Sequence, residues 1–295
     1  MIAAGGLILS WPAVYNGYPL LWFDSGEYLI AAWSHAYLPE MRSPFYGIAI
    51  VPLLALNSEW PIVFAQSGIA AATIFLTLRV VWGGLRAGHY LLLIGLLALL
   101  TSLPWQSSAI LADLPAALLP LGVFLLVFGR DRLAHWEVAF VFAVTCLSCM
   151  VHYSHLPLMA VIAVLALGIG LMERRPRGDI LRGLALCLAV IAITATAHIS
   201  VQLKARGELA IAPNGAIFPL ARLVEDGPAK DFLAAHCAEE KFALCAYVDD
   251  MPMHTTHFLW EADGPVNRLG GFAALAPEAK IIVAGTLRQE PGRIA

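Results

Sequence analysis

Long apolar segments dominate the first 203 residues and constrain the fold more than any other feature. A helix needs about 20 mostly apolar residues to cross the hydrocarbon core of a bilayer. A further apolar stretch at 45–56 follows Pro44 and is too short to span, so we expect an interfacial or re-entrant helix there. Seven segments are candidates for membrane helices: roughly 2–16, 60–78, 88–103, 109–129, 137–152, 156–172 and 183–203.

The overall composition agrees with a membrane protein. Of the 295 residues, 60% are hydrophobic and only 13% are charged, whereas a soluble domain carries about 25% charged residues. We therefore predict an all-α polytopic membrane protein with about seven transmembrane helices in residues 1–203 and a first outer loop at 17–59. Residues 204–295 have ordinary globular composition, and we expect them to form a small extracytoplasmic α+β domain. No basic tract indicates nucleic-acid binding.

Arginine residues predict the orientation in the membrane, because cytoplasmic loops collect Lys and Arg. With the N-terminus inside, the short outer loops carry only Arg42. The inner loops then carry Arg79, Arg86, Arg130, Arg132, Arg174, Arg175, Arg177 and Arg182. This orientation places the C-terminal domain outside, together with three polar segments at 17–59, 101–115 and 149–157.

Two carboxylates open the first outer loop. Asp24 and Glu27 are three residues apart, so on a helix they share a face. Paired carboxylates can supply a general base or hold a cation. The alternative is a capping box, with Asp24 at the helix N-cap and Glu27 three residues later. Both can hold, since a capping carboxylate can still face a cavity.

Arg42 and Asp113 are the other charged candidates in the outer segments. Arg42 precedes a helix that begins after Pro44, where an anion such as phosphate would fit. The alternative is an interfacial side chain that pairs with Glu40 or with lipid headgroups. Asp113 begins the fourth apolar segment, and an acid at membrane depth is a functional candidate. The alternative for Asp113 is again an N-cap.

Histidine and cysteine residues give weaker signals. His152 and His155 have the i, i+3 spacing of metal ligands, although hydrogen-bonded structural histidines are the commoner case. Cys146, Cys149 and Cys187 lie within apolar segments and are expected to be packing residues. In the C-terminal region, we predict a disulfide between Cys237 and Cys245 in an oxidising compartment. His254 and His257 could be ligands, but no third ligand is evident nearby, so we assign no metal site.

The outer segments resemble the GT-C class of polytopic membrane glycosyltransferases, which use polyprenyl-phosphate-linked sugars. The resemblance rests on "DSGEY" at residues 24–28, "RSPFYG" at 42–47, the non-spanning helix that follows, and "LADLP" at 111–115. The whole chain is also similar to a family of uncharacterised bacterial membrane proteins through segments such as "HYSHLPL" and "LCAYVDD".

The GT-C resemblance implies a site on the outer face of a bacterial inner membrane. Asp24 would be the acid of the first outer loop and Asp113 that of the second, with Glu27 as a further catalytic candidate. Arg42 would lie near the lipid phosphate. We also expect Tyr28, Tyr46, His152 and His155 to bind substrate.

The implied function is transfer of a sugar from a polyprenyl-phosphate carrier to an acceptor that the sequence does not identify. A divalent cation is compatible with this chemistry, but the sequence offers no clear ligand set. The alternative from another class is a non-catalytic transporter or lipid-binding scaffold with a GT-C-like layout. A transporter would place ionisable groups at the bilayer midplane, whereas these acids lie toward one face.

Overall fold

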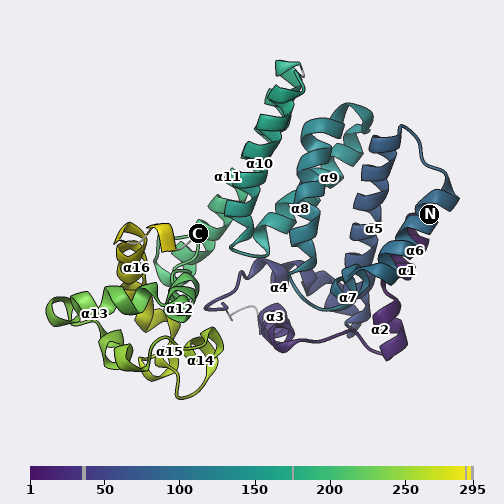
Figure 1. Ribbon diagram of the computed structural model, residues 1–295. Coiled ribbons are helices and arrows are strands. Elements are labelled where there is room, and N and C mark those ends of the chain that lie inside the picture. Colours follow the sequence, from purple (N-terminus) through teal and green to yellow (C-terminus); the bar gives the residue numbers. More distant parts are fainter. Residues whose placement is uncertain (35–37, 175, 290, 294–295) are drawn as a thin grey trace. The chain divides into compact units, whose positions relative to one another are not determined.

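The computed structural model describes residues 1–34, 38–174, 176–289 and 291–293 (Figure 1). Arg175, one of the arginines that predict orientation, lies outside these residues. The chain forms two compact units, Met1–Leu209 and Ala210–Ala295. Every named element in the described residues is helical, and the one β-type contact is an isolated bridge between Leu20 and Ala109.

The first unit is a helical bundle. Its elements in chain order are α1 (Ile2–Leu9), α2 (Trp11–Asn16), α3 (Phe23–Ser34), α4 (Phe45–Ile50), η1 (Val51–Leu56), α5 (Trp60–Trp82), α6 (Ala87–Leu100), α7 (Leu103–Ser108), α8 (Leu114–Phe124), η2 (Leu125–Gly129), η3 (Arg130–Arg132), α9 (His135–Met150), α10 (His155–Met172) and α11 (Arg177–Arg206).

Four stretches of the first unit are helical, long and apolar enough to cross a membrane. They are Trp60–Trp82, Leu114–Arg132, His155–Met172 and Arg177–Arg206. On two of these helices Leu165, Met172 and Leu188 are more than half exposed, which is the pattern of helices that face lipid. The described residues therefore form an all-α fold suited to a membrane, with four such helices, or five if the bent pair Thr255–Arg268 and Phe272–Gln289 counts as one. The structure does not show the seven spans that the sequence predicts.

The other three predicted segments form helices of fewer than 18 residues. The segment 2–16 divides into α1 and α2 at Ser10, where Pro12 in the first turn of α2 has no N–H to continue the ladder. The predicted 88–103 helix ends at Leu100, and Pro104 then starts α7. At about 1.5 Å per residue, the 14-residue α6 and the 16-residue α9 are shorter than a 30 Å hydrocarbon core. The stretch 45–56 is a short bent helix, α4 followed by η1.

A buried ion pair marks one end of the bundle. Glu137 of α9 is almost fully buried and lies 2.5 Å from Arg79 of α5. Its carboxylate also accepts a hydrogen bond from the Ala134 backbone N–H at 2.9 Å, which caps the start of α9. The pair fixes α5 against α9 at the end opposite to residues 20–24, and thus opposite to the predicted site.

The second unit is a small helical domain, so the expectation of an α+β domain is not met in its described residues. Its core gathers Phe258, Leu233, Leu220 and Ile282 with other apolar side chains. The apolar run "IIVAG" at 281–285 lies within the helix Phe272–Gln289, in which Ala residues favour helix. The elements are α12 (Ile217–Asp226), α13 (Pro228–Glu240), η4 (Ala243–Asp250), α14 (Thr255–Trp260), α15 (Pro265–Arg268), α16 (Phe272–Gln289) and η5 (Pro291–Arg293).

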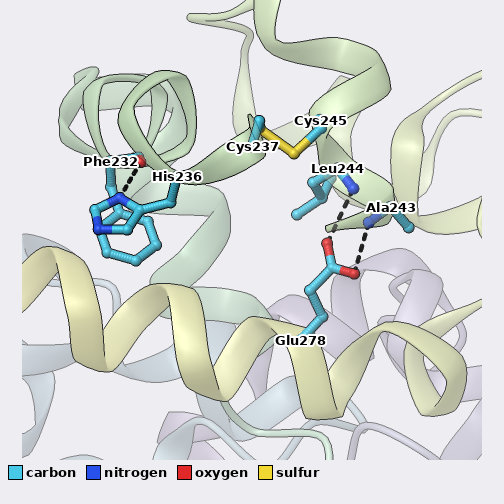
Figure 2. The surroundings of a disulfide bond; sticks show 7 residues. All are labelled: Phe232, His236, Cys237, Ala243, Leu244, Cys245 and Glu278. Carbon is cyan, nitrogen blue, oxygen red and sulfur yellow. Dashed lines mark hydrogen bonds between the residues drawn. A yellow bond between two sulfur atoms is a disulfide. The ribbon is translucent and has the colours of Figure 1, made fainter. Parts of the chain in front are cut away.

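A disulfide between Cys237 and Cys245 joins α13 to η4 (Figure 2). Beside it, the Glu278 carboxylate of α16 accepts hydrogen bonds from the Ala243 and Leu244 backbone N–H groups at 2.8 and 2.9 Å. These two N–H groups begin η4 and would otherwise lack intrahelical partners. The disulfide and the carboxylate together hold the turn between α13 and η4 onto α16.

Candidate functional site

Three polar segments meet at one end of the bundle, where α2, α3, α4 and α7 lie across the ends of the long helices (Figure 1). Leu20 pairs with the segment after α7 through backbone hydrogen bonds to Ser108 and from Ile110, both at 3.0 Å. The Ser43 hydroxyl donates to the Met150 carbonyl at 2.6 Å. The segments 17–59, 101–115 and 149–157 are therefore neighbours, as their assignment to one membrane face predicts.

Arg42 binds both acids of the first loop. Its guanidinium contacts the Asp24 carboxylate through Nη2 and lies 2.9 Å from Glu27 Oε2 through Nε. All three side chains are half-buried. α3 begins at Phe23, one residue before Asp24, so Asp24 lies in the first turn instead of at the N-cap, and Glu27 faces Arg42. Asp24 and Glu27, which share one face of α3, thus bind the same arginine side chain.

Two buried tyrosines lie next to these charges. The rings of Tyr28 and Tyr46 pack edge to face with centroids 4.7 Å apart. The Tyr46 hydroxyl donates to Gln66 Oε1 at 2.5 Å. The Gln66 amide in turn donates to the Ala109 carbonyl at 2.9 Å. This chain of contacts fixes α4 against α5 and the segment that precedes Asp113.

Asp113 is at the N-cap position of α8 but makes no side-chain capping hydrogen bond there. Its side chain is exposed. The negative charge of Asp113 influences the pKa of Tyr28, Tyr46 and His152. Asp113 therefore lies beside the same cluster. Asp113 is thus free of the capping role that was its alternative.

The histidines at 152 and 155 differ in their surroundings. His152 is exposed and pairs with its near neighbour, the Ser154 hydroxyl, at 2.8 Å. His155 is buried, and its Nδ1 contacts the Ser148 carbonyl at 2.6 Å. The two rings are 5.1 Å apart. Among the described residues no group of three metal-ligating side chains includes either histidine, so their positions favour a structural or substrate-facing role.

Burial and charge set the protonation of this cluster. Desolvation raises the pKa of the Tyr28 hydroxyl, with Arg42 opposing the rise and Asp24, Asp113 and Glu27 adding to it. Although part of the His152 side chain is exposed, the protein packed around its ring lowers its pKa, helped by the neighbouring His155 and opposed by Asp113. Both shifts favour the uncharged form, so near neutral pH the Tyr28 hydroxyl is protonated and the His152 ring is neutral.

Several residues of this region were not predicted. Gln66 is a polar residue within an apolar span, and this property alone would have identified it. His198 of α11 is buried with its ring 4.9 Å from the Phe45 ring and 4.9 Å from the Tyr153 ring. The Arg206 guanidinium donates to the Pro39 carbonyl at 3.1 Å, a contact with no signal in the sequence.

Two further clusters lie away from this cluster. In the second unit, His257 has the partners that the sequence did not reveal, with Nδ1 2.8 Å from Glu261 Oε2 and 4.0 Å from Asp263 Oδ1. These three exposed or half-buried groups lie close enough to hold a cation, but their mutual ion pairing accounts for the arrangement.

A cavity of about 470 Å³ at the other end of the bundle is lined by Arg130, Asp131 and Arg182 with Ala185 and Leu186, and it contains no predicted site residue.

The arrangement at Arg42 can position a proton acceptor and a cationic group at one end of a membrane bundle. Its acids lie on α3 and at the start of α8, and its arginine precedes α4. No protein-family model, curated protein or solved structure matches the chain.

Proposed function

We propose that the protein is a membrane glycosyltransferase that moves a sugar from a polyprenyl-phosphate carrier to an acceptor on the outer face of the membrane. The observation that carries the proposal is the convergence of Asp24, Glu27, Arg42 and Asp113 from separate segments at one end of an apolar bundle. Sugar transfer needs a base for the acceptor and a cationic group for the leaving phosphate. Both are present within one cluster.

In this proposal a carboxylate of the cluster takes the proton from an acceptor hydroxyl. The hydroxyl oxygen then attacks the anomeric carbon, and the bond from that carbon to the phosphate oxygen breaks with its electron pair on the phosphate. Asp113 is the exposed carboxylate and is not bound to Arg42, so it or Asp24 is the base. Arg42 stabilises the phosphate, because a guanidinium can bind two phosphate oxygens at once.

The charges of the site set a condition on phosphate binding. Arg42 is shared by two carboxylates, so Asp24, Glu27 and Arg42 together carry a net charge of about −1 near neutral pH. A phosphate must therefore displace one carboxylate from Arg42, or bind together with a divalent cation. Displacement would free Asp24 or Glu27 at the moment the donor binds, and so would couple donor binding to release of a base.

The proposed location is the bacterial inner membrane, with the N-terminus inside and the second unit outside. Seven crossings would give this orientation if α1 with α2, α6 and α9 each cross in addition to the four long helices. Arg79, Arg130 and Arg182 lie toward the end of the bundle opposite to Arg42, which supports the same orientation through the bias of Lys and Arg to the cytoplasmic side.

The test is turnover by the purified full chain in phospholipid vesicles. The substrates are a panel of polyprenyl-phosphate-linked sugars with bacterial envelope material as the acceptor source, and released polyprenyl phosphate is measured by mass spectrometry. We expect turnover with at least one sugar, and a loss of about 100-fold in Asp24→Asn or Asp113→Asn, whichever removes the base. The matched control is Asp131→Asn, at the other end of the bundle and mostly exposed, which should leave the rate unchanged.

A non-catalytic lipid-binding scaffold is the second candidate. The pairing of Arg42 with two acids favours it, because such a triad is also what a purely structural ion network would show. No turnover with any sugar, together with undiminished lipid binding in Asp24→Asn and Asp113→Asn, would establish the scaffold instead of the transferase.

A further inference from the structure

The helix α3 has three distinct faces. Ser25, Tyr28, Leu29 and Ala32 are buried against the rest of the first unit. The second face carries the half-buried Asp24 and Glu27 that hold Arg42. The third face lies beside the acidic face, is directed away from the buried face, and carries no charged residue. A helix on the outside of a globular protein ordinarily presents charged or polar groups on this third face.

The third face of α3 is apolar and open. Phe23 is 92% exposed, Ile30 51% and Trp33 61%. At 3.6 residues per turn these three side chains fall within about 80° of one another around the helix. Gly26 lies between them on the same side. The face defined by Phe23, Ile30 and Trp33 is apolar and exposed. Such a face is expected to contact lipid or protein instead of water.

The apolar face of α3 continues into the outer surface of the bundle. α3 packs directly on α4, where Gly47 allows the close approach: a Cβ there would lie 3.0 Å from Ala31 Cβ. α4 leads through η1 to α5, and this path exposes Ile48, Leu56 and Phe64. Phe64 belongs to one of the four helices that are long and apolar enough to span a membrane. The exposed surface of that helix would face lipid.

Aromatic side chains cluster at this end of the bundle. Tyr15, Trp22, Trp33 and Trp105 are all exposed there, on α2, α3 and α7 or beside them. Trp and Tyr concentrate at the boundary between the acyl chains and water, where the ring is buried and its polar group remains hydrated. Their presence at the level of α3 is what a membrane boundary at that level predicts.

We propose that α3 lies in the membrane interface, with Phe23, Ile30 and Trp33 inserted among the lipids of the leaflet at this end of the bundle. A helix of this kind buries its apolar face about 5–10 Å into the boundary between headgroups and acyl chains. The adjacent acidic face then holds Asp24 and Glu27, with Arg42, at the depth of the lipid headgroups. This inference concerns lipid contact and stands whether or not the chain transfers sugars.

The test measures the depth of spin labels on α3. Single cysteines replace Phe23, Ile30 and Trp33 in the full chain, which is reconstituted in vesicles of phosphatidylethanolamine and phosphatidylglycerol. Leu165→Cys, on the exposed side of α10, is the lipid reference, and Glu239→Cys, exposed on the second unit, is the aqueous reference. The unchanged chain is the labelling blank, because Cys146, Cys149 and Cys187 are half-buried or buried.

The readout is the ratio of collisions with oxygen, which dissolves in lipid, to collisions with a water-soluble nickel complex. We expect the three α3 labels to exceed the Glu239 label in this ratio by at least about fivefold, approaching the Leu165 label. A ratio equal to that of Glu239 would mean that the face is in water. Low collision rates with both reagents would mean that a second copy or another part of the protein covers the face. Either result overturns the proposal.

A second measurement needs no substitution in the chain. Vesicles that contain a phospholipid with a photoreactive tail are irradiated with the unchanged protein, and the crosslinked peptides are mapped by mass spectrometry. We expect crosslinks within residues 22–33 at a yield similar to that of α10. Crosslinks confined to the four long helices would overturn the proposal even if a labelled variant failed to fold.

Discussion

The two units of this chain treat apolar side chains in opposite ways. In the second unit, Phe258 and Leu233 are fully buried in a core closed by a disulfide. In the first unit, Leu99, Leu165 and Phe23 are each more than half exposed, and polar residues such as Glu137 and Thr145 are buried. The distribution of apolar side chains in each unit therefore suits a different solvent. Water drives apolar groups inward in one, and lipid permits them outside in the other.

The largest expected effect separates buried from lipid-facing apolar residues. Phe258→Ala removes a fully buried ring from the core of the second unit and should lower its free energy of unfolding by about 3–5 kcal/mol. Leu165→Ala, on the exposed side of α10, should change stability by less than about 0.5 kcal/mol. Hydrogen exchange of α16 and α10 amides in vesicles measures both. Equal losses of stability in Phe258→Ala and Leu165→Ala would contradict the contrast between buried and lipid-facing apolar side chains.

Removal of the disulfide should act on the second unit alone. The Cys237–Cys245 bond joins residues eight positions apart, and closure of a loop of this size contributes about 2.5 kcal/mol through the unfolded chain. The double variant Cys237→Ala/Cys245→Ala should therefore speed hydrogen exchange in α13 and η4 and leave α5 and α8 unchanged. An unchanged second unit would show that Glu278 and the apolar core suffice to hold this turn.

The buried ion pair of the first unit should be more costly to break than an exposed one. Arg79→Gln leaves the buried Glu137 carboxylate without its cation. We expect a loss of about 2 kcal/mol, below the 3–5 kcal/mol of a fully buried pair because Arg79 keeps contact with solvent. Arg182→Gln, in an exposed pair with Asp179, is the matched control and should cost less than about 1 kcal/mol. Thermal unfolding in detergent compares the two.

The smallest expected effect on stability is at the candidate site. Arg42→Gln leaves Asp24 and Glu27 facing each other without a cation, and we expect a loss of about 1 kcal/mol because both acids retain contact with water. Arg42→Lys keeps the charge but not the fork that reaches both acids, so it should fall between Arg42→Gln and the unchanged chain. A loss much larger than this would assign Arg42 a mainly structural role.

The sequence predicted the polar end of the bundle better than the number of long helices. The arginine bias places 17–59, 101–115 and 149–157 on one face, and the contacts from Leu20 and Ser43 join these segments. Charged residues are rare in an apolar chain, so those that occur together stand out. The helix ends were harder to predict, because Pro12 and Pro104 shorten or divide segments whose hydropathy looks continuous.

Tertiary contacts account for what the sequence could not provide. The spacing of Asp24 and Glu27 fits a capping box equally well, and only the position of Arg42 decides what the carboxylates bind. His257 finds Glu261 and Asp263 across a turn that has no distinctive motif. The second unit was expected to be an α+β domain, whereas its described elements are all helical and share a core that includes Phe258.

The most direct test of the central claim is native mass spectrometry of the detergent-purified full chain with polyprenyl phosphate. We expect a bound polyprenyl phosphate or its sugar conjugate in the unchanged protein. Binding should weaken about tenfold or more in Arg42→Ala, because charge-assisted hydrogen bonds to the phosphate are lost. Arg86→Ala, at an exposed position before α6, should bind as the unchanged chain does. An unchanged protein that carries only bulk phospholipid and takes up no added polyprenyl phosphate would contradict the account.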